Sequence, residues 1–301
     1  MLPPAIIFEQ IVSKPRLDSY RGYWKVGPEA AVGLYMWNGE VCGEVGKLLS
    51  YFEVVLRNNI HRELSLHTTA GVSSSTHWWD HLAGQLKSGT LSKIADVRAD
   101  AHPAWPTPDE IVSRLSFGFW PNVLTWIAKQ RPTLMPKILP AHPLSLPGAA
   151  PNWSNPAARR DALTEFFEIK DLRNRIAHHE PLWKFAPVMD TSTSPATVVA
   201  PASTDEASSL VRFGRLLQRY DQAVGALSPD LFAHIRISTW RARLEYLLSS
   251  RGLERYKAGG HIAEASFMST LALRQQFASI VQRNKPVRVF DHGGEGIFIP
   301  S

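Results

Sequence analysis

The sequence contains a single cysteine, Cys42, among 301 residues. One cysteine cannot form a disulfide within the chain, so a disulfide framework is excluded and a reducing, cytoplasmic compartment is expected. No stretch approaches the roughly 18 consecutive apolar residues of a membrane span, and the N-terminus lacks a basic start followed by a long apolar run. We therefore expect neither a signal peptide nor a membrane partner.

Several catalytic motifs are also missing. The segment 42–49, CGEVGKLL, lacks the first glycine of a phosphate-binding loop and has Leu48 where a metal-binding Ser or Thr is required. There is no G-x-S-x-G, no G-x-G-x-x-G and no H-E-x-x-H. His178, His179 and Glu180 are consecutive, so on a helix they point about 100° apart and cannot all reach one metal. We predict no metal site and no cofactor.

The composition, with 44% hydrophobic and 20% charged residues, is typical of a soluble globular protein. The net charge is only +6, but segment 210–257 alone carries nine Arg or Lys and four Asp or Glu residues. One interpretation is a surface that follows an RNA backbone, with Arg236, Arg241 and Arg243 among its contacts. The other is a set of helices whose arginines are solvated or paired with acids elsewhere.

Apolar residues recur at three- and four-residue steps along most of the chain, which predicts a mostly helical protein. Segment 30–64 follows this pattern, and its glycines predict a division into two helices. Further helices are expected near Thr76, after Thr107, and from about Ala157 to the two histidines. Recurring prolines in 131–156 predict a surface connection with at most a short helix.

A polar, small-residue stretch, SPATVVAPASTDEASS, is the best candidate boundary in the chain. It predicts a helical domain at 1–193, a linker at 194–209 and a basic helical extension at 210–301 that packs on the same bundle. Two amphipathic helices are expected after the linker. The tail 287–301 is then either a hairpin or an extended arm.

The stretch Asp171–Trp183, DLRNRIAHHEPLW, places an arginine, an asparagine and two histidines at the end of a predicted helix. At about 100° per residue, one apolar stripe faces the core. The stripe consists of Ala162, Phe166, Ile169, Leu172 and Ile176. Asn174 and His178 are four apart and share a face nearly opposite this stripe, and Arg173 can emerge from its edge toward the same rim.

These groups suit RNA cleavage without a metal, because RNA supplies its own nucleophile, the ribose 2′-hydroxyl. Histidine acts as a general acid or base near neutral pH, so His178 is the candidate proton carrier. Arg173 is placed to stabilise the negative charge that develops on the phosphate. Asn174 is placed to orient the ring or to contact the phosphate.

A second Leu-Arg-Asn string, EVVLRNNIHREL, occupies 53–64. Glu53, Arg57 and His61 recur every four residues, which favours an internal ion pair. The string, with Asn58, is either a supporting layer that positions His178 and contacts phosphate, or a structural ladder across a buried polar seam. For His179 a supporting role and a capping or packing role are both open.

Four blocks lie in order between Ala30 and Phe185: YMWNGEV, YFEVVLRNNIHREL, SFGFWPNVL and LRNRIAHHEPLW. The last contains Arg173-Asn174-x-x-x-His178, which resembles the R-x-x-x-x-H motif of HEPN ribonucleases. Together the blocks resemble the Abi-like (abortive infection) family of bacterial HEPN proteins. Beyond Ser194 the resemblance is weak.

The resemblance implies an all-α fold, a HEPN-like helical bundle with additional C-terminal helices. It further implies a homodimer with the motif helices facing each other and a metal-independent endoribonuclease of phage-defence or toxin–antitoxin type. An antitoxin protein or RNA is then a further possible partner. Two alternatives stay open: a non-catalytic dimer that binds RNA or a nucleotide as a sensor, and a partner-binding dimer whose polar seam fixes register.

Overall fold

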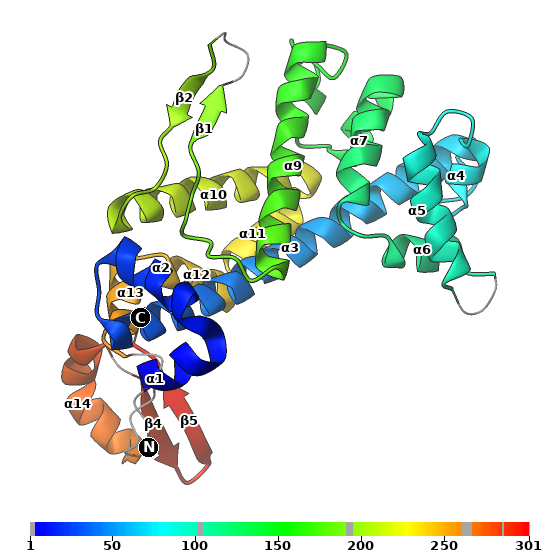
Figure 1. Cartoon of the computed structure of the whole chain (residues 1–301). Helices are drawn as coiled ribbons and strands as arrows, with labels where there is room; N and C mark the ends of the chain where they lie inside the picture. Colours follow the sequence, from blue (N-terminus) through cyan, green and yellow to red (C-terminus); the bar gives the residue numbers. More distant parts are fainter. Residues whose placement is uncertain (1–3, 102–104, 191–194, 260–266, 285, 301) are drawn as a thin grey trace. The chain divides into compact units, whose positions relative to one another are not determined.

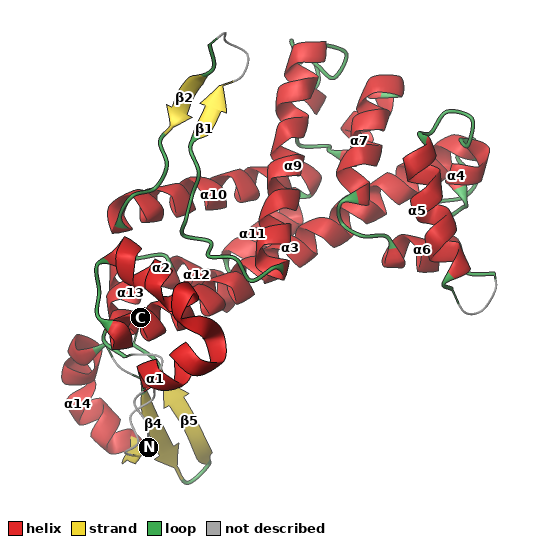
Figure 2. Ribbon diagram, viewed as in Figure 1, coloured by secondary structure: helices red, strands yellow, loops and turns green. Residues whose placement is uncertain are grey.

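The computed structural model of the chain describes residues 4–101, 105–190, 195–259, 267–284 and 286–300. These residues are mostly helical, with a few short strands (Figures 1 and 2), so the predicted helical character is confirmed. Among them, none of the helices combines the length and the apolar character that crossing a lipid bilayer requires.

The chain forms two compact units, each built from separated stretches of sequence. Unit 1 comprises Met1–Val45, Glu180–Leu216 and Ile237–Ser301, and unit 2 comprises Gly46–His179 and Leu217–Arg236. Two long helices, α3 (Pro28–Thr68) and α10 (Glu206–Leu227), contribute residues to both units. The predicted linker 194–209 therefore does not coincide with a unit boundary.

The linker itself is partly regular. It contains strand β2 (Thr197–Ala200) and the first residues of α10, while Ser194 lies outside the described residues. Strand β2 pairs antiparallel with β1 (Val188–Asp190). Small and β-branched residues in this stretch thus form a hairpin arm where the composition predicted an irregular connection.

Helix α3 runs unbroken for 41 residues, so the prediction that glycines divide segment 30–64 was wrong. The reason is a buried apolar stripe that continues straight through the glycines, and such packing outweighs the cost of about 1 kcal/mol for each glycine. The stripe consists of Leu34, Trp37, Val41, Val45, Leu48, Phe52, Leu56, Ile60 and Leu64.

Unit 1 packs aromatic rings at the centre of its helices. The ring centroid of Trp183 lies 5.1 Å from that of Tyr20 and 5.7 Å from that of Trp24. The centroids of Trp24 and Trp37 are 5.9 Å apart, and each of these pairs packs edge to face. The remaining helical elements of this unit are α1 (Pro4–Phe8), the π-helix η1 (Glu9–Ser13), α2 (Lys14–Trp24), α12 (Thr239–Leu247), α13 (Ser250–Lys257) and α14 (Thr270–Arg283).

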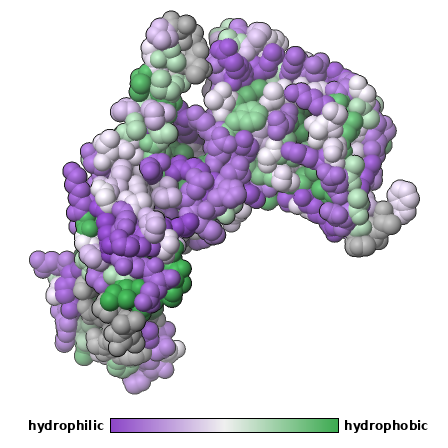
Figure 3. All heavy atoms as spheres, viewed as in Figure 1, coloured by the Kyte–Doolittle hydropathy of each residue, from purple (hydrophilic) through white to green (hydrophobic). Residues whose placement is uncertain are grey.

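The tail of unit 1 is the hairpin, one of the two predicted alternatives. Strand β4 (Val287–Asp291) pairs antiparallel with β5 (Gly294–Phe298) and parallel with β3 (Phe267–Ser269). Figure 3 shows hydrophobic patches on this face of the molecule near α1 and η1, where Ile6 and Ile11 are exposed.

Unit 2 centres on four rings. The ring centroid of Phe52 lies 5.7 Å from that of Phe166, 6.1 Å from that of Phe117 and 6.2 Å from that of Tyr220. All four side chains are buried. The helices of this unit, besides the parts of α3 and α10, are α4 (Trp78–His81), α5 (Ser88–Ala99), α6 (Pro108–Arg114), α7 (Phe119–Gln130), η2 (Pro132–Leu134), α8 (Met135–Ile138), η3 (Pro143–Ser145), α9 (Pro156–Ala177) and α11 (Pro229–Arg236).

The predicted helices of unit 2 differ in how far they extend. The helix after Thr107 is confirmed, with a capping box between Thr107 and Glu110. The helix expected near Thr76 lasts a single turn, and the second amphipathic helix expected after the linker is interrupted. It ends as α11 at Arg236, and α12 begins after Ser238, whose side chain accepts the Arg241 N–H.

Gly43→Ala tests whether α3 is held by its buried stripe. Gly43 is exposed and helical, and no atom lies within 4 Å of an added Cβ. We expect the free energy of unfolding in urea to rise by about 0.5–1 kcal/mol. Gly252→Ala is the contrasting variant, since its Cβ would lie 2.1 Å from the Tyr246 carbonyl oxygen; we expect a loss of about 1–3 kcal/mol. Destabilisation by Gly43→Ala would show that this face is packed.

Candidate functional site

The candidate motif lies at the C-terminal end of α9. Asn155 caps the start of this helix by accepting the Ala158 N–H at 3.0 Å. At the other end His178 is the C-cap residue, and its N–H donates to the Asn174 carbonyl at 2.9 Å. His179 then takes a left-handed conformation with φ 54°, and Pro181 follows shortly after. The polar end of the helix is therefore also its terminus, and His179 occupies the left-handed position that follows the C-cap.

The rotation of α9 agrees with the predicted stripe over most of its length. Phe166, Ile169 and Leu172 are buried as expected, and Leu163 takes the place predicted for Ala162. The side chains of Arg173, Asn174 and His178 are exposed, together with His179. The motif therefore forms an open surface.

Helix α3 brings Glu53 and Arg57 to this end of α9. Glu53 is half-buried, and burial raises the pKa of its carboxyl, while the charges of Arg173 and Arg57 act in the opposite direction. Arg57 donates from Nη1 to the Ser113 carbonyl at 3.4 Å, and its buried Nε has no hydrogen-bond partner among the described residues. Glu53 of the first Leu-Arg-Asn string is therefore close enough to Arg173 of the second for their charges to interact.

His61, the third member of the predicted ladder, has a separate environment. The Trp78 Nε1–H donates to its Nδ1 at 3.1 Å, so the ring proton lies on Nε2, which is 3.2 Å from the Ser75 hydroxyl and 3.4 Å from Asp109 Oδ1. Burial lowers the pKa of His61, with Asp109 opposing the shift. The structural alternative describes His61 best, since the ring is 4% exposed and both nitrogens have partners. Asn58 is exposed on α3.

The basic segment 210–257 has acidic partners inside the chain. Arg241 is buried and pairs with Glu245 at 2.8 Å. Arg243 pairs with Glu40 and Glu44, and Arg236 lies over the Phe232 ring at 5.8 Å. These contacts favour the interpretation of paired arginines, and RNA binding by these three residues stays a prediction. Further ion pairs of the segment join Arg219 to Glu168, and Lys257 to Glu206 and Glu254.

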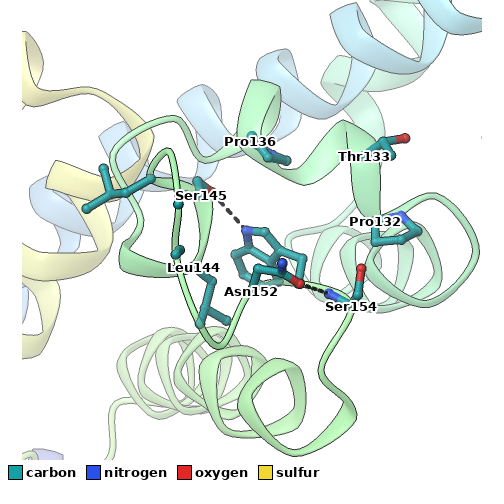
Figure 4. Close-up of a pocket in the computed structure, with 11 residues that line it drawn as sticks. Pro132, Thr133, Pro136, Leu144, Ser145, Asn152 and Ser154 are labelled. Carbon is teal, nitrogen blue, oxygen red and sulfur yellow. Dashed lines mark hydrogen bonds between the residues drawn. The ribbon is translucent and has the colours of Figure 1, made fainter.

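A cavity of about 290 Å³ lies in the proline-rich connection of unit 2 (Figure 4). Its polar groups are satisfied locally, because Trp153 Nε1 donates to the Ser145 hydroxyl at 2.8 Å and the Ser154 N–H donates to Asn152 Oδ1 at 2.9 Å. Its lining contains no titratable side chain. This cavity therefore offers no acid–base chemistry.

Comparison of the chain with protein-family models, with curated proteins and with solved structures gives no match. In the described part of the chain, no group of three or more His, Cys, Asp or Glu side chains is arranged to hold a metal ion.

Glu165 of α9, a carboxyl with a raised pKa, was not among the predicted site residues. Burial raises its pKa from 4.5 to about 7, with Arg219 opposing and Glu168 reinforcing the shift. A signal was present in the sequence, because Glu165 lies four residues before Ile169 and seven before Leu172, on the core side of the helix. A carboxylate within an apolar stripe marks a group that burial will perturb.

Paired alanine variants separate the structural histidine from the candidate catalytic one. We expect His61→Ala to lower the free energy of unfolding at pH 7.5 by about 2–4 kcal/mol, because it leaves a cavity and unpaired polar groups. His178→Ala, at an exposed position, should change it by no more than about 0.5 kcal/mol. Since the pKa of folded His61 is lowered, its contribution is complete above pH 6.5 and declines as the pH falls below that value. Equal losses in both variants would contradict this assignment.

Proposed function

We propose that the protein is a metal-independent endoribonuclease of phage-defence or toxin–antitoxin type. His178 acts as general acid or base, Arg173 stabilises the phosphate, and Asn174 orients the reacting groups. The observation that carries the proposal is the exposed set of Arg173, Asn174 and His178 in the last turns of α9, with Arg57 of α3 beside it. The resemblance of the four sequence blocks to Abi-like HEPN proteins supports the same activity.

The chemistry requires only groups that this surface offers. The ribose 2′-hydroxyl attacks the adjacent phosphorus, the 5′-oxygen leaves, and a 2′,3′-cyclic phosphate remains. His178 removes the hydroxyl proton or protonates the leaving oxygen. The guanidinium of Arg173 can bind two phosphate oxygens at once as their negative charge increases.

Glu53 has a positioning role in this proposal. It is the carboxyl whose charge interacts with both Arg173 and Arg57, so it favours the approach of two guanidinium groups to the same end of α9. With Glu53 ionised the three residues carry a net charge of +1, which attracts a phosphate.

The motif is expected to work as a pair in a homodimer, with the motif helices of two copies facing each other. One histidine and one arginine make a small active site, and a two-fold axis doubles both groups. The same exposed cations can also bind RNA or a nucleotide without cleaving it, so a sensor dimer is the alternative function.

The end groups of RNA products test the proposal. Total RNA is incubated in EDTA with wild-type protein and with His178→Ala, and the termini are analysed. We expect 2′,3′-cyclic phosphates from the wild type and a rate about 10²–10⁴-fold lower from the variant. Cyclic ends formed equally by both proteins would remove His178 from the mechanism. Intact RNA in both samples, with binding that weakens as salt rises, would support the sensor dimer.

Arg173→Lys tests the two-point contact with phosphate. Lysine keeps the charge and loses the planar fork, so we expect kcat to fall at least about tenfold while RNA binding changes little. Arg160→Lys is the matched control, because Arg160 is exposed on the same helix and lies outside the motif. An equal loss in the two variants would indicate a general effect of replacing an arginine on α9.

A further inference from the structure

A second cavity of unit 2, of about 660 Å³, is lined by α9, α10, α11 and the residues just before and at the start of η3. This volume is within the range of small-molecule sites. Arg173, Asn174 and His178 do not line it, so it is separate from the proposed catalytic surface. The side chains that matter for its chemistry are His142, Glu165, Gln218, Asp221, Gln222 and Arg236.

Glu165 lacks a partner for its charge. Its carboxyl makes no hydrogen bond or ion pair with the described residues, although it is substantially buried. The nearest cation that acts on it is Arg219, and Arg219 forms its ion pair with Glu168. The carboxyl is therefore protonated more readily than usual, with a pKa of about 7. A donor placed in the cavity would compensate for the lost hydration of the carboxylate.

The part of the cavity that α10 lines is polar as well. Gln218, Asp221 and Gln222 lie at positions i, i+3 and i+4, so they share one face of the helix. The amide oxygens of Gln218 and Gln222 are acceptors for N–H groups. The cavity thus offers acceptors from two helices.

With Glu165 ionised, the charged side chains of the lining carry a formal net charge of −1, because Glu165 and Asp221 outnumber Arg236. His142 accepts the Leu144 N–H at Nδ1 over 3.1 Å, and burial lowers its pKa to about 4, so the ring is neutral at pH 7. Arg236 lies over the Phe232 ring, with 5.8 Å from Cζ to the centroid, and is not among the charges that act on Glu165. Asp221 adds a negative charge to the lining.

We propose that this cavity binds a small organic cation, an ammonium or a guanidinium compound, with Glu165 as its counter-ion and the α10 side chains as additional acceptors. An anion would meet two carboxylates, and a neutral ligand would leave the charge of Glu165 uncompensated. The site does not depend on the proposed nuclease activity.

Calorimetric titration of the full chain tests the site with three probes in a buffer that contains no amine. Putrescine carries two ammonium groups, agmatine carries one ammonium and one guanidinium, and 1,4-butanediol is a neutral diol on the same four-carbon chain. We expect putrescine or agmatine to bind and the diol not to bind. Tighter binding of agmatine would show that the site prefers a guanidinium group, and tighter binding of putrescine would show that it prefers an ammonium group. Binding of the diol as tight as that of both cations, or no binding of any probe, would overturn the proposal.

The pH dependence gives an independent readout. A cation favours ionised Glu165, and a carboxyl with a pKa of about 7 is about ten times more ionised at pH 8 than at pH 6. The association constant should therefore be about tenfold higher at pH 8, and Glu165→Gln should abolish this dependence and weaken binding at least tenfold. Asp161→Asn, at an exposed position of the same helix outside the cavity, is the matched control. Loss of binding in this control to the same extent would contradict the role of Glu165.

Thermal unfolding checks whether Glu165→Gln is folded. The direction in which its Tm differs from that of the wild type is a further test. Burial makes ionised Glu165 unfavourable in the folded state, and this cost appears as the pH rises from 4.5 through 7. Glu165→Gln should therefore have a higher Tm than the wild type at pH 8 and a similar Tm at pH 4. A variant that is more stable at pH 8 and does not bind the cation would show that a destabilising carboxyl is kept for binding. A lower Tm at pH 8 would mean that Glu165 has a stabilising partner and would contradict the proposal.

Discussion

Phe52 of α3 and Phe166 of α9 pack ring against ring at 5.7 Å, and both side chains are buried. This contact fixes how the two helices are rotated toward each other, because neither ring can turn outward without exposing its apolar surface. Glu53 is the next residue on α3, and Arg173 follows Phe166 by about two turns on α9. The electrostatic link between Glu53 and Arg173 is therefore a consequence of the aromatic core.

Two carboxyls near this core, Glu53 and Glu165, show how neighbours change the effect of burial. Burial raises the pKa of both. The charges of two arginines act on Glu53, whereas the one arginine that acts on Glu165 is paired with Glu168, whose own charge reinforces the shift. The first carboxyl is suited to position cations of the chain, and the second is suited to receive a cation from outside.

The sequence predicts α9 well, because its stripe, its start and its end depend on local rules. Phe166, Ile169 and Leu172 follow helical periodicity, and the cap residues stand where capping requires them. The course of α3 was not predictable in this way. Glycine propensity is a local quantity, and the stripe that keeps α3 continuous is stabilised by residues far away in the sequence. The two units, each built from separated stretches of sequence, depend on tertiary packing for the same reason.

Charge was the least predictable property. Nine cations and four acids in 210–257 suggest a basic surface, but Glu40, Glu44 and Glu168, which neutralise part of it, come from other segments. A count within a window cannot include partners that only the fold brings close. The motif residues were placed better, because exposure at a helix end is decided by the helix itself.

That exposure limits what a single copy of the site can do. Electrostatic stabilisation of a transition state is strong where water is excluded and weak where it is not. Arg173, Asn174 and His178 lie on an open surface, so their full effect requires a cover that removes water from the phosphate. RNA itself can supply part of this cover, and the motif helix of a second copy would supply the rest together with a second arginine and histidine. The exposure of the site is therefore a second argument for the proposed homodimer, beside the small number of its groups.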